Sequence, residues 1–248
     1  MSINDTGFNK SLIVKNIVKI FSKRKVVNNL SLFIKQGEVI GLLGPNGAGK
    51  TTTFHIIVGL IRPDNGEIII GEKNILGIPM YKRALLGLSY LPQEPSIFKK
   101  LTVAENIMIV LEYSSLNAEQ RKSKIDNLLE EFNISKLYKS KGYMLSGGER
   151  RRVEIARTLA LDPLFILLDE PFAGIDPIAI IDIQGIINHL KKRGIGILIT
   201  DHNVRETLKI TDRSYVINNG EILASGTASE VSGDPQVKRI YLGENFSL

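Results

Sequence analysis

The sequence contains no cysteine, which excludes disulfides, thiolate metal ligands and a cysteine nucleophile. Long apolar stretches are also missing. The longest runs, such as 39–43 and 165–168, have the length of a strand and fall far short of the roughly 18 residues of a membrane-spanning helix. Residues 1–12 lack the basic and then apolar layout of a signal peptide. We therefore expect a cytoplasmic, globular protein.

Positive charge is in excess but is not concentrated. The net charge is +6, yet the basic clusters at 23–25, 99–100, 150–152 and 191–193 lie in different segments, and no aromatic-rich strand of an RNA-binding type accompanies them. A solvated surface is favoured over direct binding of nucleic acid. Hydrophobic residues make up 43% and charged residues 23%, as in ordinary soluble proteins, and 248 residues suffice for one large domain or a domain with an inserted lobe.

The pattern along the chain predicts an α/β protein. Residues 12–36 carry short β-branched runs separated by polar turns, as antiparallel strands do. A fully buried strand over 37–44 is followed at once by a helix over 50–60, and 66–75 form another strand after turn residues.

The β signals fade between 94 and 162. A capping box of Asn117 and Gln120 predicts a helix through Phe132, and a second helix is expected to begin near Ser146. We expect this segment to be a helical lobe inserted into a core made of 1–93 and 163–248. The remaining predictions are strands over 164–169 and 195–200, helices over 177–193 and 203–209, and a hairpin that turns at Asn219-Gly220.

A phosphate-binding loop joins the buried strand to the helix. Gly44, Gly49, Lys50 and Thr51 have the spacing G-x-x-x-x-G-K-T, in which backbone N–H groups and a helix N-terminus face phosphate, the lysine neutralises the outer phosphates, and the threonine ligates Mg²⁺. The predicted nucleotide contacts are Gly44, Pro45, Asn46, Gly47, Ala48, Gly49, Lys50, Thr51 and Thr52.

Two acids and a histidine end later strands. Asp169 and Glu170 close the apolar run 165–168, at the strand edge where open α/β sheets bind ligands. We expect Asp169 to hold Mg²⁺ through water and Glu170 to orient and deprotonate the attacking water. His202 follows strand 195–200 at the same edge and is a candidate γ-phosphate contact.

The sequence has a second glycine-rich helix start, so it has two candidate anion sites but residues for only one catalytic centre. Ser146, Gly147 and Gly148 form another candidate anion site, yet the chain has one acidic pair and one candidate histidine. Either this segment folds onto the phosphate loop of its own chain or it serves a second copy.

The phosphate loop is followed along the chain by LSGGE at 145–149, FILLDEP at 165–171 and the strand-end His202. With these motifs in this order, the chain resembles the ATP-binding subunit of ABC transporters over nearly its whole length. The resemblance implies a P-loop NTPase core of the RecA type, an N-terminal antiparallel β subdomain and an inserted α-helical subdomain. It implies ATP and Mg²⁺ as ligands. It also implies a homodimer in which Ser146, Gly147 and Gly148 close over the γ-phosphate bound by the partner copy.

The resemblance assigns three further residues. Gln93 in YLPQE corresponds to a glutamine that reaches Mg²⁺ and the water and senses the membrane partner, and Asp176 in AGID corresponds to the acid at the dimer seam. Phe21 is the candidate for stacking on adenine, a contact that needs only a ring face. Phe33 is the alternative, although its sequence context indicates a core position.

Within the superfamily, the chain resembles most closely the ATPase family of the bacterial lipopolysaccharide export machine. The resemblance lies in segments 44–61, 90–107, 145–160, 165–183, 197–208 and 237–248. That family works as a homodimer at the cytoplasmic face of the inner membrane, peripherally, below two integral membrane subunits, and need not touch the cargo. A groove near Phe98 would receive a short helix of those subunits; Phe98 could instead close the core of the helical lobe. Lys99 and Ser247 stand where arginine is expected.

Two alternatives remain open. The chain could serve another ABC transporter, such as a branched-chain amino acid importer, whose ATPases share the one-domain layout and a YLGE ending. It could also be an ABC ATPase that acts on DNA or the ribosome without a membrane partner, although such proteins usually carry long coiled-coil insertions or two cassettes in one chain, and this sequence has neither.

Overall fold

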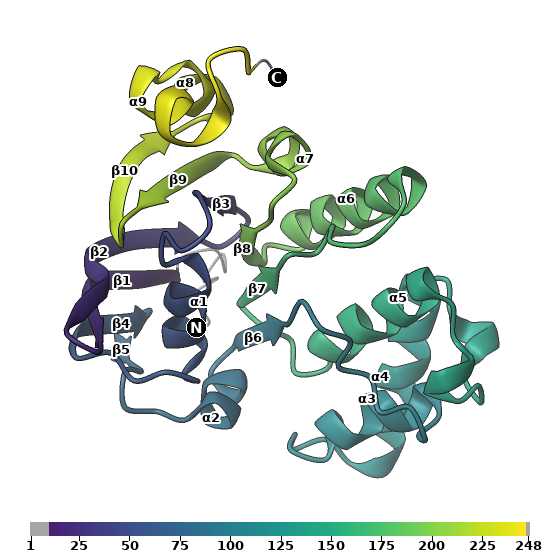
Figure 1. Cartoon of the computed structure of the whole chain (residues 1–248). Coiled ribbons are helices and arrows are strands. Elements are labelled where there is room, and N and C mark those ends of the chain that lie inside the picture. Colours follow the sequence, from purple (N-terminus) through teal and green to yellow (C-terminus); the bar gives the residue numbers. More distant parts are fainter. Residues whose placement is uncertain (1–9, 247–248) are drawn as a thin grey trace, which may run out of the picture.

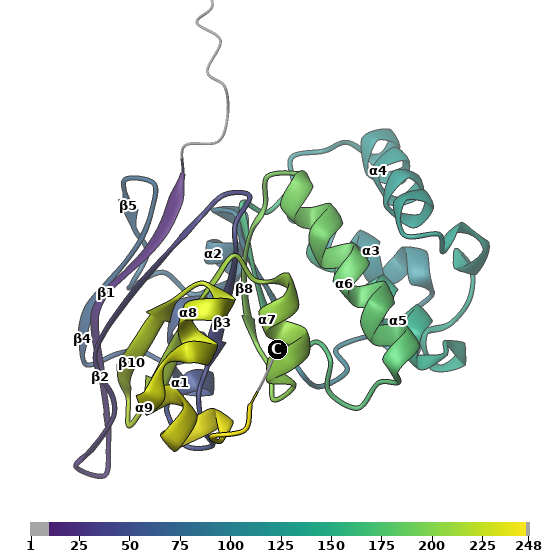
Figure 2. The ribbon, with the colours of Figure 1, turned by 90° about the horizontal axis from the view of Figure 1, so that it is seen from above.

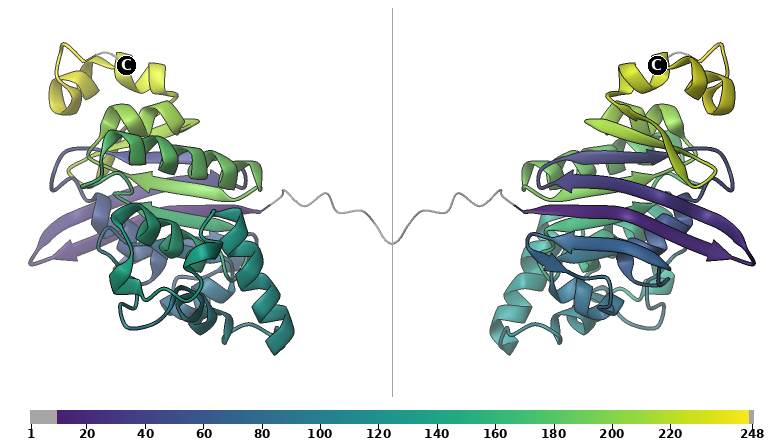
Figure 3. Two further views of the ribbon diagram at one scale, coloured as in Figure 1. Left: turned by 90° about the vertical axis from the view of Figure 1, so that its right-hand side faces the viewer. Right: turned by 90° about the vertical axis from the view of Figure 1, so that its left-hand side faces the viewer.

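A computed structural model describes residues 10–246 of the protein. The first of its two sheets is antiparallel, with the strand order β2-β1-β4-β5. Strands β1 (Ser11–Phe21) and β2 (Arg24–Lys35) form one long hairpin, and Ser22 and Lys23 at its tip have the positive φ angles that a tight hairpin turn requires. Strands β4 (Asn65–Ile70) and β5 (Lys73–Asn74) complete the sheet, which covers one side of the molecule (Figure 3). The prediction of antiparallel strands over 12–36 is confirmed.

The second sheet carries the functional edge and has the order β10-β9-β3-β8-β7-β6. All neighbouring strands run parallel except the pair β9 and β10. Every residue of β3, β7 and β8 is buried, because helices or the other sheet cover both faces, and this explains their uninterrupted apolar sequences. The bounds are β3 (Val39–Leu43), β6 (Leu88–Leu91), β7 (Phe165–Asp169), β8 (Gly196–Thr200), β9 (Arg213–Asn218) and β10 (Glu221–Gly226).

Helix α1 (Lys50–Val58) lies between the two sheets (Figure 1). Its apolar residues Phe54, Ile56 and Ile57 share a core with the inward side chains of β1, β2 and β4 and with β3. The N-terminus of α1 therefore sits at the carboxyl edge of the parallel sheet, where its free N–H groups face outward.

On the opposite side of the parallel sheet, several helices share a second core with β7 and β8; α6 lies along the sheet, and α3 and α4 lie farther out (Figures 1 and 2). Capping boxes at Thr102, Asn117 and Ser146 start three of them, which confirms the two predicted starts at Asn117 and Ser146. The helical character of 94–162 is thus present, whereas its independence as a lobe stays a prediction. The helices are α3 (Val103–Leu111), α4 (Ala118–Glu131), α5 (Gly147–Thr158) and α6 (Pro177–Lys192).

The remaining helices flank the ends of the sheets. Helix α2 (Met80–Leu85) precedes β6, and α7 (Val204–Ile210) follows β8. The hairpin of β9 and β10 turns at Asn219 and Gly220, both at positive φ, as predicted. Beyond it, α8 (Ala228–Gly233), α9 (Pro235–Val237) and a π-helical turn (Lys238–Leu242) pack against α7 and β9 (Figure 1). None of the helices within 10–246 has the length and apolar character needed to cross a membrane.

Candidate active site

The phosphate-binding loop occupies residues 44–49, between β3 and α1. Gly44 and Gly49 have φ angles of 146° and 107°, and a Cβ atom would lie 2.2 Å from the Ile217 carbonyl oxygen at the first and 2.6 Å from that of Val26 at the second. Side chains are therefore impossible at both positions. At Gly47 nothing lies within 4 Å of the place of a Cβ, so the backbone there is open to a ligand.

The Lys50 side chain is held inside this loop. Its amino group donates to the carbonyl oxygens of Gly44, at 2.7 Å, and Pro45, at 3.0 Å. Burial lowers the pKa of Lys50, and the nearby carboxylates of Glu170 and Asp169 oppose that shift. The ammonium group thus stands between the loop carbonyls and the acidic pair, where a phosphate group would be neutralised.

One cavity brings several of the predicted residues together. It has a volume of about 410 Å³, within the range of small-molecule sites. Its walls combine the phosphate loop with the carboxyl ends of β7 and β8 and one residue of β2. They are Val26, Asn46, Gly47, Gly49, Lys50, Thr51, Thr52, Glu170 and His202.

Glu170 is at the centre of a hydrogen-bonded triplet. Its own φ is 47°, and its N–H donates to the Thr200 carbonyl oxygen at 2.7 Å, which fixes the turn after β7. One carboxylate oxygen accepts from Gln93 Nε2 at 2.6 Å and the other lies 2.8 Å from His202 Nε2. The structure therefore brings together Gln93, Glu170 and His202, the three predicted catalytic residues, from three separate segments.

Asp169 lies beneath this triplet and is only 5% exposed. Burial raises the pKa of its carboxyl group, and a hydrogen bond from the Tyr90 hydroxyl to Oδ2, at 3.0 Å, opposes the shift. Beside it in register, the hydroxyl of Thr200 is buried without a hydrogen-bond partner within 10–246. A buried carboxylate next to an unsatisfied hydroxyl suits a hydrated magnesium ion, which binds through oxygen atoms and keeps several waters.

The LSGGE segment at 145–149, here called the signature, lies away from this cavity. Ser146 caps α5 through a reciprocal pair of hydrogen bonds with Glu149, and Ser146, Gly147 and Gly148 are all exposed. The two glycines line a small cavity against α6 and contribute nothing to the cavity around Lys50. The chain therefore does not fold this helix start onto its own phosphate loop.

Helix α5 instead holds the segment that contains Gln93. Arg151 donates to the Pro92 carbonyl oxygen at 3.1 Å, Glu154 accepts the N–H of Ser96 at 2.7 Å, and Arg157 donates to the Ser96 carbonyl oxygen at 2.9 Å. The expectation of a solvated surface for the basic cluster 150–152 is thus wrong for Arg151, whose side chain is only 11% exposed, and Arg157 is held in the same way. Burial lowers the pKa of both guanidinium groups.

The two aromatic candidates for adenine lie on the antiparallel sheet. Phe21, 45% exposed, ends β1 and is absent from the cavity wall, to which β2 contributes Val26. Phe33 is not a core residue as its sequence context predicts, because 42% of it is exposed and the Arg213 guanidinium covers its ring at 4.1 Å. Its ring face is therefore already occupied by an arginine.

Asp176 is exposed at the start of α6. Its carboxylate accepts the N–H groups of Ile178, at 3.0 Å, and Ala179, at 2.9 Å, and so caps the helix. The side chain keeps this structural task whether or not it also contacts nucleotide.

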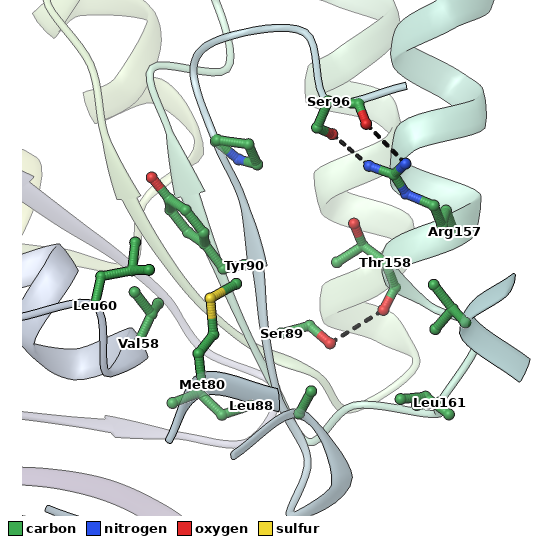
Figure 4. A pocket seen from close by; sticks show the side chains of 13 residues that line it. Val58, Leu60, Met80, Leu88, Ser89, Tyr90, Ser96, Arg157, Thr158 and Leu161 are labelled. Atoms are coloured by element: carbon green, nitrogen blue, oxygen red, sulfur yellow. Dashed lines mark hydrogen bonds between the residues drawn. The ribbon is translucent and has the colours of Figure 1, made fainter. Parts of the chain in front are cut away.

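A groove of about 310 Å³ lies on another side of the Gln93 segment (Figure 4). Phe98 is not part of the groove wall, but its ring lies 5.5 Å from the guanidinium of Arg157, which is; with 48% of it exposed, Phe98 is not buried in the core of α3 to α5. Lys99 beside it is exposed, whereas Ser247 lies outside the described residues. The walls of this groove are Val58, Leu60, Met80, Ala84, Leu88, Ser89, Tyr90, Pro92, Ser96, Val110, Arg157, Thr158 and Leu161.

Comparison with known proteins places this arrangement in a family. The sequence pattern described as ABC transporter matches residues 27–173, from β2 through the phosphate loop and the signature to the turn after β7. The chain belongs to the ABC transporter family. As an ATP-binding cassette of this family it binds and hydrolyses ATP, and ATPase subunits of this kind dimerise and pair with membrane subunits.

Relatives cover the cassette from end to end. The lipopolysaccharide export system ATP-binding protein LptB of Haemophilus influenzae is 57% identical over 238 residues, 96% of this chain and 99% of its own length. The protein of that name from Escherichia coli K12 is 54% identical over 239 residues, with the same coverage. An ABC transporter ATP-binding protein of Rhizobium meliloti is 54% identical over 247 residues, all of this chain and 92% of its own.

Solved structures agree with the fold. An ATP-binding cassette of an ABC transporter in its ADP conformation superimposes with a TM-score of 0.85 at 32% identity, and the match covers 95% of this chain and 99% of that one. A nucleotide-free cassette gives 0.83 at 32% identity, covering 95% and 100%. The predicted P-loop core with its antiparallel β subdomain is confirmed.

Sequence reasoning missed two residues of the site. Tyr90 is part of an ordinary β-strand pattern, and only the pairing of β6 with β7 brings it to Asp169. Asp201 precedes the predicted His202, is 2% exposed, and accepts the N–H groups of Phe172 and Asn203, both at 2.8 Å. Like Asp169, Asp201 stands at the end of an apolar strand, and this position could have identified it as a site residue.

Proposed function

We propose that the triplet around Glu170 hydrolyses ATP held by the phosphate loop. The observation that carries this proposal is the placement of Glu170 between Gln93 and His202 in the wall of the cavity that contains Lys50. Glu170 orients the attacking water and accepts its proton, while His202 supports the γ-phosphate. Magnesium, when bound, neutralises charge on the transferred phosphoryl group; Thr51, Gln93 and Asp169 are its proposed ligands.

The nucleotide contacts proposed for one chain are those of residues 44–52, with Phe21 at the adenine ring. A second copy completes the site through Ser146, Gly147 and Gly148, because the helix start at these residues faces solvent and not its own phosphate loop. Asp176 lies at the seam between the two copies. Two chains then bury two ATP molecules, and hydrolysis loosens the interface.

We propose further that the cassette drives export of lipopolysaccharide from the inner membrane toward the outer membrane. Two proteins named as lipopolysaccharide export ATP-binding proteins match 96% of the chain at 54% and 57% identity. The chain would then lie at the cytoplasmic face of the inner membrane, bound to two integral subunits and touching neither the cargo nor nucleic acid.

One observation favours another transporter. The pattern of branched-chain amino acid ATP-binding cassette transporters matches residues 221–247, the tail that follows β9. This match covers a small part of the chain, however, whereas the export proteins match nearly all of it. An importer of branched-chain amino acids is therefore the second candidate.

The proposed cargo is tested by identifying the membrane proteins that copurify with the tagged cassette. We expect two different polytopic subunits of the lipopolysaccharide export system in stoichiometric amounts after detergent extraction, identified by mass spectrometry. Importer permeases in their place would support the second candidate, and a fraction free of membrane proteins with ATPase activity stimulated by nucleic acid would contradict both transport proposals.

Phe98 and its groove are the proposed docking site for a short helix of a membrane subunit. Phe98→Ala should leave ATP binding unchanged and reduce copurification of the membrane subunits, because it removes an exposed aromatic ring that lies against Arg157 of the groove wall. The matched control is Phe33→Ala, which removes a similarly exposed ring from the antiparallel sheet. Equal recovery of membrane subunits with both variants would argue against the groove.

A further inference from the structure

A single side chain connects the groove with the catalytic edge of the sheet. Tyr90 lies near the end of β6, paired in register with Leu167 of β7. Its ring forms part of the groove wall (Figure 4), and its hydroxyl donates to Oδ2 of Asp169 at 3.0 Å. Within the described residues 10–246, no other residue of the groove wall makes a hydrogen bond to Asp169 or Glu170.

The ring of Tyr90 is also fixed against the helix that follows the phosphate loop. It meets the His55 ring of α1 edge to face, with centroids 6.4 Å apart and planes at 88°. Because a phenol is rigid and its oxygen lies in the ring plane, pressure on the ring from the groove must move the hydroxyl as well. The partner of that hydroxyl is a carboxylate that is 5% exposed and accepts no other hydrogen bond within residues 10–246.

We propose that Tyr90 is a positioning residue that transmits occupancy of the groove to Asp169. A helix of a membrane subunit in the groove would press on the exposed face of the ring, and the hydroxyl would set the orientation of the carboxylate toward the magnesium ion. This inference rests on the proposed docking of the membrane subunit in the groove. It adds a route to Asp169 that is separate from Gln93, which acts on Glu170.

The chain offers a matched control in the same groove. The hydroxyl of Ser89 donates to the Thr158 carbonyl oxygen at 3.1 Å and has no bond to the acidic pair (Figure 4). Tyr90→Phe and Ser89→Ala therefore each remove one hydroxyl from the groove wall, and only the first removes a bond to Asp169. Melting temperatures of the two variants are compared first; Tyr90→Met, which keeps apolar bulk without a hydroxyl, replaces Tyr90→Phe if that variant does not fold.

Two measurements then test the inference. In the isolated cassette, the increase in ADP affinity on adding Mg²⁺ should fall roughly three- to tenfold in Tyr90→Phe and stay unchanged in Ser89→Ala, because a hydrogen bond to a charged group is lost only in the first. In the complex with the membrane subunits, the stimulation of ATPase activity by those subunits should fall by a similar factor in Tyr90→Phe, with unchanged copurification.

The outcomes separate this inference from the proposed docking. Tyr90→Phe with the Mg²⁺ effect of wild type, or with a reduced Mg²⁺ effect but full stimulation by the membrane subunits, would overturn the role of Tyr90. Leu60→Asp places a charge in the groove wall and tests docking alone. Full recovery of the membrane subunits with this variant would overturn the groove as their binding site. The effect of the Tyr90 hydroxyl on Mg²⁺ binding is measured in the isolated cassette and does not depend on that result.

Discussion

Glu170 shows how much of the chemistry depends on contacts between distant residues. One oxygen of its carboxylate accepts a hydrogen bond from the side-chain amide of Gln93, and the other lies beside the His202 imidazole. Each of the three side chains comes from a different loop at the carboxyl edge of the sheet. Their residue types and order along the chain were predictable, whereas the hydrogen bonds that join them depend on strand order.

Glu170→Gln should bind ATP as the wild type does and hydrolyse it at least roughly a hundredfold more slowly, because the amide cannot accept the proton of the attacking water. Phosphate release in a single turnover and nucleotide binding are the measurements. Glu94→Gln, the same change at an exposed acid beside Gln93, is the control. Hydrolysis by Glu170→Gln at a rate close to that of the control would show that another group is the base.

Asp64 predicts a pH-dependent contribution to stability. Its carboxylate accepts the N–H of Ile20 at 2.6 Å and the Lys19 amino group at 3.2 Å, and these contacts lower its pKa. A lowered pKa stabilises the fold above the unfolded-state value of about 4, and the effect is lost as pH falls through the folded pKa.

Asp64→Asn should therefore be less stable than wild type at pH 7, and the two should converge as pH falls below about 4. Urea unfolding at several pH values measures the difference. A difference that is the same at every pH would show that the carboxylate charge is not its cause.

At the scale of elements, local patterns predicted most strands, although not β6, and the starts of α1, α4, α5, α6 and α7. The buried parallel strands have uninterrupted apolar sequences, and the capping boxes at Asn117 and Ser146 are readable because their partners lie three residues away. Other elements depend on distant residues. The buried Arg83 of α2 donates to four carbonyl groups of two segments, including those of Ile56 and Ile57 at the end of α1, and no local pattern indicates this role.

The cap of α4 gives a test at this scale. Asn117→Ala should lower the free energy of unfolding by about 1 kcal/mol, because the N–H of Gln120 loses its acceptor. Chemical denaturation measures this loss, and the comparison is Glu119→Ala, a change in the first turn of α4 at a side chain that makes no hydrogen bond within residues 10–246. Equal stability of both variants would mean that the cap contributes nothing to α4.

At the scale of the whole molecule, the two halves of the proposed ATP site lie apart in the folded chain. The phosphate loop, Glu170 and His202 share one cavity, while Gly147 and Gly148 line another against α6. Sequence alone left open whether these halves meet within one chain. Their separation in the folded chain favours a pair of chains, each supplying the helix start that closes over the ATP of the other.

The most direct test combines Glu170→Gln, which retains bound ATP, with Ser146→Arg, which obstructs the signature. Light scattering with ATP and Mg²⁺ should show a dimer for Glu170→Gln and a monomer for the double variant, while the monomer still binds ATP with nearly unchanged affinity. Loss of ATP binding by the monomeric double variant, or its dimerisation to the same extent as Glu170→Gln, would contradict an ATP site shared between two copies.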